Sequence, residues 1–164
     1  QAYETHDFDS LESASSKFLG IMSDLDKILA THDLFLFETQ WLGPARALAG
    51  DDDKLAGFYE FNAKNQVTMW GPEGEISDYA SKQHAGLVSG YYLNRWTLFI
   101  DAAKDALYRG VEFSNDRFEK GCKYWEKNWQ HRRHKYPDQP EGDTYKISVT
   151  LYEKYISRGE VAHW

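Results

Sequence analysis

Residues 66–96 read QVTMWGPEGEISDYASKQHAGLVSGYYLNRW, and they contain the sharpest change of pattern in the chain. A helical pattern stops at the segment 70–74, WGPEG, because glycine and proline are poor helix formers. A new helical pattern begins near Ser77 or Asp78. The sequence therefore predicts a corner in which Trp70 ends one helix and faces a glycine-rich turn and the start of the next. Such a corner is suited to holding a small polar ligand.

Three side chains at this corner are candidates for binding a sugar. Trp70 offers a flat ring that can stack on the apolar face of a pyranose. Ile76 adds an apolar wall. Tyr79, at the start of the predicted helix, can exchange a hydrogen bond with a hydroxyl group. The alternative is that Trp70 and Tyr79 pack the corner together and bind no ligand.

Before the corner, apolar residues recur at steps of three and four and predict three helices. The first runs from a cap at Asp9 or Ser10 to about Ala30. The second covers about 34–49 and is kinked or interrupted at Gly43-Pro44, because proline removes a helix hydrogen bond. The third opens at the acids 51–53, which suit the positive end of a helix. One face of this third helix is predicted to carry Leu55, Phe58, Asn62, Gln66 and Met69.

After the corner, four further helices are predicted. A fourth covers about 79–91, and a fifth runs from Trp96 to Leu107 and is closed by Gly110. Ser114 or Asn115 caps a sixth, and Asp143 caps a seventh. The sixth has a core stripe of Phe118, Cys122, Trp125 and Trp129, and the seventh one of Ile147, Leu151 and Tyr155. No alternating strand pattern stands out, so we expect an all-α fold, a single bundle-like domain of about six or seven helices over residues 1–164.

The totals exclude several classes of partner. The chain has 164 residues, a net charge of −7 and a pI of about 5.3. Nucleic acids and anionic membranes require a basic surface, so neither is expected as a partner. No apolar run approaches the roughly 20 residues that span a bilayer. The single cysteine, Cys122, excludes an internal disulfide and is interpreted as a small buried residue.

Motifs for chemistry are missing as well. The glycines of the corner lack the spacing of phosphate or dinucleotide loops, and no nucleophile triad is visible. The basic cluster 131–135, HRRHK, is interpreted as a solvated helix end, since a metal site needs ligands beyond its two histidines. Glu73, Glu75 and Asp78 are interpreted as capping or solvated acids. We therefore expect no catalytic residue, metal site or cofactor in this chain.

A resemblance to a known family rests on motifs spread through most of the chain. They are Phe58-Tyr59-Glu60, Asn62, Gln66, Trp70-Gly71-Pro72-Glu73-Gly74, Asp78-Tyr79-Ala80, Lys82-Gln83, Ala85-Gly86-Leu87-Val88, Tyr91-Tyr92, Arg95-Trp96, Tyr136-Pro137, Gln139-Pro140 and Gly142-Asp143-Thr144. The chain resembles the C-terminal helical region of the α-N-acetylglucosaminidases, glycoside hydrolase family 89. This family includes a lysosomal enzyme that degrades heparan sulfate.

The resemblance implies both a function and a missing partner domain. Family members are retaining exo-hydrolases that remove terminal α-linked N-acetylglucosamine from glycans. Their two catalytic glutamates lie on a TIM-like barrel of the same polypeptide, and the helical domain closes one side of the pocket. Carried over by position, Trp70, Ile76 and Tyr79 line that pocket. The resemblance also implies that the helical domain begins upstream of Gln1, that this fragment alone is inactive, and that the enzyme is secreted, periplasmic or lysosomal.

Two alternatives stay open at this point. A stand-alone sugar-binding module would bind N-acetylglucosamine by itself, although half a pocket encloses little ligand surface. A helical interaction domain without a sugar role would bury Trp70 and Tyr79 against neighbouring helices. If the chain is part of a larger enzyme, we expect the face that meets the barrel to be an exposed apolar patch.

Overall fold

The computed structural model describes residues 2–71, 74–78 and 80–157, and within these ranges the chain forms six α-helices and one small hairpin. The α-helices are α1 (Phe8–Leu29), α2 (Gly43–Ala47), α3 (Asp53–Val67), α4 (Leu93–Tyr108), α5 (Asn115–His131) and α6 (Thr144–Tyr155). The strands β1 (Met69–Trp70) and β2 (Ile76–Ser77) pair with each other, and three short helical turns complete the set: η1 (Asp33–Phe35), η2 (Glu38–Leu42) and η3 (Val88–Tyr92). The predicted all-α class is confirmed.

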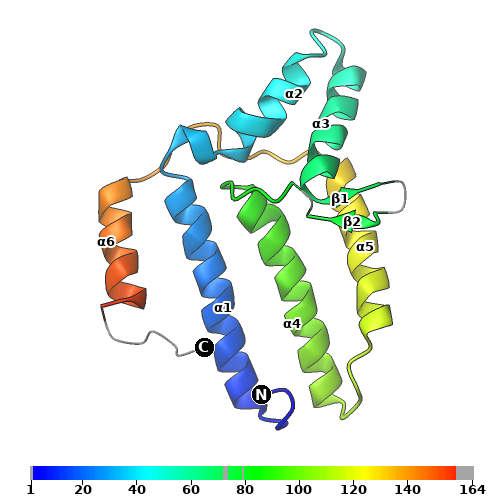
Figure 1. Cartoon of the computed structure of the whole chain (residues 1–164), viewed down its shortest axis with the longest axis vertical. Coiled ribbons are helices and arrows are strands. Elements are labelled where there is room, and N and C mark those ends of the chain that lie inside the picture. The colour runs from blue at the N-terminus through cyan, green and yellow to red at the C-terminus, as the bar shows by residue number, and fades with distance from the viewer. Residues whose placement is uncertain (1, 72–73, 79, 158–164) are drawn as a thin grey trace.

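The long helices form a single layer, which Figure 1 shows in face view. In this layer α4 lies between α1 and α5, and α6 packs on the outer flank of α1. Helices α2 and α3 pack together at one end of the layer, and the β1–β2 hairpin lies beside α3 and α5 at the same end. The hairpin therefore lies next to the ends of several helices. Main-chain and side-chain groups at helix ends can form hydrogen bonds with it.

Where a helix is capped by its own sequence, the predicted start is correct or nearly so. The side chains of Asp52, Ser114 and Asp143 accept hydrogen bonds from the first turns of α3, α5 and α6. The first helix begins slightly earlier than predicted, because Asp7 rather than Asp9 or Ser10 is its cap. Gly110, with φ of +65°, ends α4 as expected.

The second predicted helix is wrong over its first residues. Leu36 is not helical but forms a parallel β-bridge with Ala85, in which the Ala85 amide donates to the Phe35 carbonyl at 2.7 Å. The helix starts only at η2, a π turn that runs directly into α2. Pro44 does not break it, because it stands in the first turn of α2, where the missing N–H costs nothing.

The fourth and fifth predicted helices are one helix. Residues 80–86 are not helical, η3 begins at Val88, and the predicted break near residues 92–94 is instead a π turn that continues into α4. This helix has no cap in its own sequence. Asp26 of α1 supplies one, because its Oδ1 accepts from the amides of Gly86 and Ser89 at 2.9 Å each. A cap from a segment 60 residues away is invisible to a local pattern.

The buried face of α3 also differs from the prediction. Phe58 is 57% exposed and Gln66 is exposed, whereas Glu60 and Lys64 are buried. Lys64 Nζ donates to Glu60 Oε1 at 2.6 Å and to the Arg132 carbonyl at 2.5 Å. The periodicity was assigned to the wrong side because the buried face of α3 combines an ion pair with Ala63 and Val67, so no continuous apolar stripe marks it. The core proper contains Phe37, Leu42, Ala63, Val67, Leu87, Val88, Tyr91, Tyr92 and Trp129.

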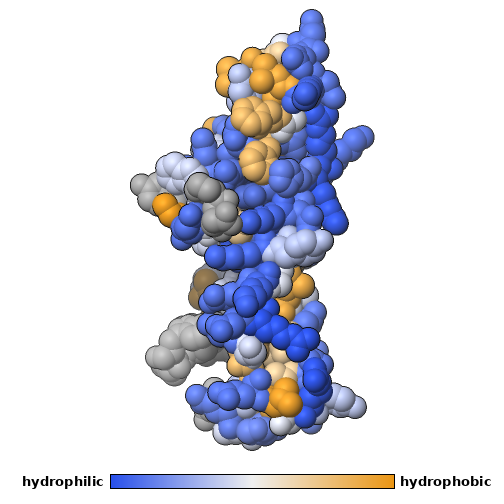
Figure 2. Space-filling model, turned by 90° about the vertical axis from the view of Figure 1, so that its right-hand side faces the viewer, coloured by the Kyte–Doolittle hydropathy of each residue, from blue (hydrophilic) through white to orange (hydrophobic). Residues whose placement is uncertain are grey.

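Viewed from the side, the layer is thin and exposes hydrophobic side chains near both ends (Figure 2). At the end that carries α2 and α3, Leu48 is 78% exposed and Phe58 is 57% exposed. At the opposite end, Tyr108 and Val111 are exposed. Among the described residues, no helix is both long and apolar enough to cross a membrane.

Candidate functional site

The β1–β2 hairpin places two of the three predicted sugar-binding residues next to each other. Trp70 and Ile76 are direct partners in the antiparallel pairing, so their side chains leave the same face of the hairpin. Trp70 is 43% exposed and Ile76 is 45% exposed. Tyr79, the third predicted residue, lies outside the described residues. The predicted pairing of a flat ring with an apolar wall is therefore present in the structure.

The hairpin turns where the glycines of WGPEG permit it. Gly71 has φ of +101° and Gly74 has φ of +71°, and the Gly74 amide donates to the Gly71 carbonyl at 3.1 Å. L-residues with a side chain rarely adopt such angles. A Cβ on Gly71 would also lie 2.3 Å from a carboxylate oxygen of Glu75. The sequence thus folds back here because both glycines supply backbone angles that other residues resist.

The first strand is anchored by the end of α5. Gln130 Nε2 donates to Thr68 Oγ1 at 2.9 Å and to the Met69 carbonyl at 3.2 Å. The Thr68 hydroxyl in turn donates to the Lys64 carbonyl at 2.7 Å. All four residues are buried. These bonds fix the chain immediately before Trp70.

The second strand is anchored by α4. Arg95 forms a two-pronged contact with Asp78, with Nη2 to Oδ2 at 2.5 Å and Nη1 to Oδ1 at 3.1 Å. Its Nη1 also lies 3.2 Å from Glu126 Oε1, which accepts the Tyr91 hydroxyl at 2.7 Å. The Asp78 amide closes the strand end by donating to the Thr68 carbonyl at 2.6 Å. Two helices and the end of a third therefore meet at this corner.

The surroundings of Arg95 keep its guanidinium charged, and those of Tyr91 keep its hydroxyl protonated. Burial acts to lower the pKa of Arg95, but its contacts with Asp78 and Glu126 outweigh burial and raise that pKa. Burial, assisted by Glu126, raises the pKa of the Tyr91 hydroxyl, which therefore stays protonated and donates. Asp78 and Glu126 serve as acceptors for Arg95, so Asp78 is neither the solvated nor the capping acid that the sequence predicted but one half of an ion pair.

Sequence reasoning singled out the exposed residues of the hairpin and missed those that hold it. Arg95, Glu126 and Gln130 were not predicted to contribute. Arg95 stands in a family motif, but neither Glu126 nor Gln130 belongs to one, and both lie on the predicted core helix 115–131. Polar residues buried within that helix, with Glu126 4% and Gln130 5% exposed, are the signal that marks them.

The exposure of Trp70 bears on the alternative of a purely structural corner. That alternative requires Trp70 to be buried against neighbouring helices. Trp70 is 43% exposed and also takes part in an interaction within the protein. Its partner in that alternative, Tyr79, lies outside the described residues, so both readings of the corner stay open.

The basic cluster 131–135 acts as a tether between α5 and α3. The Arg133 guanidinium contacts the Asp53 carboxylate and carbonyl at 2.8 Å each, and the His131 ring stacks on Phe61 with centroids 4.6 Å apart. Arg133 is solvated, as predicted for this cluster, and the two contacts join helices rather than binding a ligand. Within the described ranges, no group of three or more His, Cys, Asp or Glu side chains is placed to hold a metal ion.

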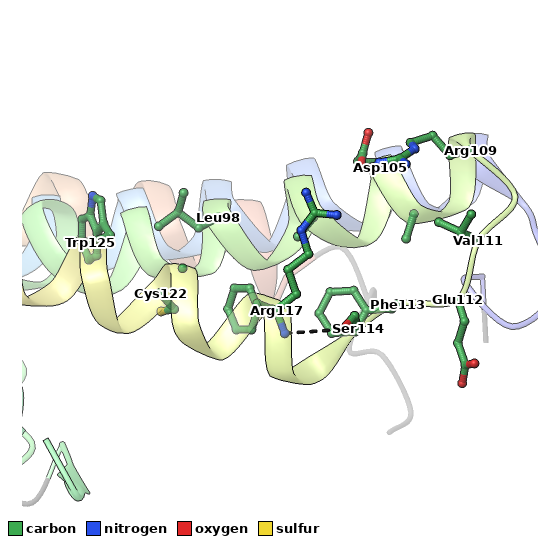
Figure 3. A pocket seen from close by; sticks show the side chains of 14 residues that line it. Leu98, Asp105, Arg109, Val111, Glu112, Phe113, Ser114, Arg117, Cys122 and Trp125 are labelled. Carbon is green, nitrogen blue, oxygen red and sulfur yellow. Dashed lines mark hydrogen bonds and ion pairs between the residues drawn. The ribbon is translucent and has the colours of Figure 1, made fainter. Parts of the chain in front are cut away.

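A hollow of about 370 Å³ lies between α4 and α5, toward the end of the layer opposite the hairpin (Figure 3). Its wall is mostly apolar and includes Leu98, Val111 and Phe113. Cys122 also lines it, and burial together with Glu126 raises the pKa of this thiol to about 12. Such a thiol is protonated and unreactive at neutral pH, which agrees with its predicted structural role.

The comparisons with known proteins identify the family. The family model described as the α-N-acetylglucosaminidase (NAGLU) C-terminal domain matches residues 1–154. The chain belongs to this family. The human α-N-acetylglucosaminidase is 40% identical over 144 residues, which are 88% of this chain and 19% of that protein. The resemblance seen in the sequence is confirmed.

Solved structures of α-N-acetylglucosaminidase relatives agree in fold. A family 89 glycoside hydrolase from Clostridium perfringens, in complex with PUGNAc, is 27% identical with a TM-score of 0.79 over 96% of this chain and 18% of that one. The same organism's enzyme in complex with its substrate GlcNAc-α-1,4-galactose is 26% identical with a TM-score of 0.78, covering 93% of this chain and 18% of that one. The chain thus spans less than a fifth of the length of these relatives.

Proposed function

We propose that this domain forms one wall of the active-site pocket of a retaining exo-α-N-acetylglucosaminidase, which hydrolyses terminal α-linked N-acetylglucosamine from glycans. In this proposal Trp70, Ile76 and Tyr79 contact the sugar. The catalytic carboxylates come from a TIM-like barrel on the same polypeptide, which is the domain's structural partner. In this proposal residues 1–164 belong to the helical C-terminal domain of that enzyme.

The cross-strand pairing of Trp70 with Ile76 is the observation that carries this proposal. Both side chains leave the same face of the hairpin and both are more than two-fifths exposed. A half-exposed tryptophan beside an aliphatic side chain matches the apolar face of a pyranose ring. The family relationship supports the same conclusion, because a relative of this domain occurs in an enzyme solved with its substrate GlcNAc-α-1,4-galactose.

The domain supplies recognition and not chemistry. Glycoside hydrolysis by this route requires two positioned carboxyl groups, about 5 Å apart in a retaining enzyme. At the corner, Asp78 and Glu126 are engaged by Arg95 and do not serve this purpose. The isolated domain is therefore expected to be inactive. Hydrolases of glycan chains meet their substrates outside the cytosol, so we place the enzyme in a secreted, periplasmic or lysosomal setting.

The test is the activity of the full-length protein on a chromogenic α-N-acetylglucosaminide. We expect Trp70→Ala and Ile76→Ala each to lower kcat/KM about tenfold or more, a loss of roughly 1.4 kcal/mol of transition-state stabilisation. Tyr79→Phe removes one hydroxyl and is expected to have a similar effect. Tyr152→Ala and Ile21→Ala are matched controls, because Tyr152 on α6 is 56% and Ile21 on α1 is 47% exposed, on helices away from the hairpin.

Unchanged kcat/KM in the hairpin variants, with a fall in thermal stability alone, would contradict the proposal. The domain would then be scaffold, and the pocket would belong to the barrel. Equal losses in Trp70→Ala and in the control Tyr152→Ala would lead to the same conclusion, because they would report unfolding rather than lost contact with the sugar.

A further inference from the structure

The hairpin that carries Trp70 and Ile76 is too small to hold its own position. Each strand has two residues, and the pairing consists of Trp70 with Ile76 and Met69 with Ser77. Isolated two-stranded hairpins are marginally stable at best, even when longer than this. The placement of the two exposed side chains therefore depends on the groups that grip the hairpin from outside.

The two strands of the hairpin are bound to the helices by different kinds of contact. The side before Trp70 is held by neutral hydrogen bonds from Gln130 to Thr68 and Met69. The side after Ile76 is held by the charged contact between Asp78 and Arg95. Charge-assisted and two-pronged bonds are about twice as strong as neutral ones and also fix orientation. The side that carries Ile76 is thus the one whose position is set by a guanidinium.

Arg95 is itself held rigidly. Its guanidinium carbon lies 5.2 Å from the Tyr91 ring centroid and 5.5 Å from that of Tyr92, over both rings. Its Nη1 contacts Glu126, which is buried and takes a second bond from Tyr91. The planar fork is therefore fixed in orientation by α4 and α5 before it reaches Asp78.

Asp78 is held in a conformation that needs such support. Its φ is +54°, in the left-handed region that residues other than glycine seldom occupy. A single residue in this conformation persists when its surroundings impose it. The bonds to Arg95 and from the Asp78 amide to the Thr68 carbonyl impose it here. Because Asp78 follows β2 directly, its orientation determines where the strand lies.

We propose that Arg95 is a positioning residue for substrate recognition, which acts by holding Asp78 and thereby fixing the hairpin face that presents Trp70 and Ile76. This inference rests on the proposed function of the hairpin. Arg95 does not touch the sugar. Its contribution to catalysis passes through Trp70 and Ile76, so the contribution disappears when those side chains are removed.

The experiment is a double-mutant cycle in the full-length protein. Arg95→Lys keeps the charge but loses the planar fork that grips both oxygens of Asp78. Asp78→Asn is a second, milder variant, because it leaves the buried contact between Arg95 and Glu126 intact. Each is combined with Trp70→Ala. Arg109→Lys is the matched control, since Arg109 pairs with Asp105 on the same helix, at the end away from the hairpin.

We expect Arg95→Lys to lower kcat/KM for a chromogenic α-N-acetylglucosaminide about tenfold or more, and Asp78→Asn about fivefold, at temperatures where circular dichroism shows both to be folded. Arg109→Lys is expected to stay within twofold of the wild type. Adding Trp70→Ala to Arg95→Lys is expected to cost less than a further twofold. A merely stabilising arginine would lower the melting temperature without producing this non-additivity.

Two results would overturn the inference. In the first, Arg95→Lys and Asp78→Asn are both folded and keep kcat/KM within twofold of the wild type, while Trp70→Ala has a lowered kcat/KM. The other is full multiplication of the separate effects in the double variants, which would mean that Arg95 does not act through Trp70. Failure of the proposed function itself has a different signature, since Trp70→Ala alone would then retain wild-type kcat/KM.

Discussion

The helix formed by η3 and α4 differs between its two ends. Its first turns form hydrogen bonds and ion pairs with side chains from α1 and α5, whereas its last turn is stabilised mainly by residues of the helix itself. Asp26 caps the start and Glu126 anchors Arg95, both through buried or half-buried contacts. At the other end, Arg109 pairs with Asp105 in an exposed contact within the same helix, and a hollow opens beside it. The constrained end is the one beside the hairpin.

This difference teaches that, within this helix, the buried polar contacts lie at the end beside a small element that must be placed. Apolar packing is sufficient to hold long helices together, because its strength depends on area rather than direction. A two-residue hairpin offers little area and must be oriented by directional bonds. Paired substitutions at the two ends of the helix test this interpretation.

The largest difference is expected at Glu126. Glu126→Ala leaves the buried Tyr91 hydroxyl without its acceptor and removes one of the two carboxylates that Arg95 contacts, and breaking a buried charged pair typically costs about 3 to 5 kcal/mol. Glu112→Ala, an exposed carboxylate at the other end, is expected to change stability by less than about 0.5 kcal/mol. Urea denaturation followed by circular dichroism gives both values, and equal costs would break the comparison.

Two glycines with positive φ provide the next pair. Gly86 has φ of +89°, and a Cβ there would lie 2.8 Å from a ring carbon of Tyr136. Gly110 has φ of +65° and open space around it. Gly86→Ala adds a clash to backbone strain and is expected to cost about 2 to 3 kcal/mol, against about 1 kcal/mol for Gly110→Ala. The same denaturation experiment measures both variants. If Gly110→Ala and Gly86→Ala lower the free energy of unfolding equally, Tyr136 moves away from the added Cβ at no cost.

The acids at the two ends are expected to differ by a smaller amount. Asp26→Ala removes the side chain that caps η3 and should lower the free energy of unfolding by about 1 to 2 kcal/mol. Asp26→Asn keeps an acceptor oxygen and should retain part of this stability. Asp105→Ala breaks an exposed pair within α4 and should cost about 0.3 to 0.5 kcal/mol. Thermal unfolding measures both effects, and a harmless Asp26→Ala would show that water replaces the cap.

The smallest effect concerns Cys122, on the wall of the hollow. Its pKa is raised to about 12 in the folded protein, while an unfolded thiol titrates near 8.5. Because the folded state holds the proton more tightly, this stabilising contribution is complete below pH of about 8.5 and is lost as the pH rises above it. We expect a loss of less than about 1 kcal/mol between pH 7 and 9. Cys122→Ala should lack this pH dependence, and an identical slope in both proteins would assign it to other groups.

The features predicted correctly from sequence are those decided within a few residues. The caps of α3, α5 and α6 were identified because each side chain binds the turn that follows it. The turn between Trp70 and Ile76 was located because its glycine-rich sequence is itself a local signal. All-α content followed in the same way from helical periodicity.

The features that were missed depend on partners distant in sequence. The start of η3 is set by Asp26, and the exposed face of α3 by a buried ion pair of Glu60 and Lys64. The two-residue strands carry no periodicity, since alternation needs more residues than they possess. The anchors Arg95, Glu126 and Gln130 are polar residues on helices, and only their burial against the hairpin distinguishes them from solvated ones.

The anchors of the hairpin all follow it in the chain, and this has a consequence for biosynthesis. Gln130 is about 60 residues beyond Trp70, which a ribosome adds in about 3 to 12 seconds at 5 to 20 residues per second. In the last part of that interval the nascent chain contains Arg95 but not Gln130, so only the side of the hairpin that carries Ile76 has its anchor. The corner is completed only when α5 has been synthesised, so a chain truncated between α4 and α5 contains α1 to α4 but lacks the anchors Glu126 and Gln130.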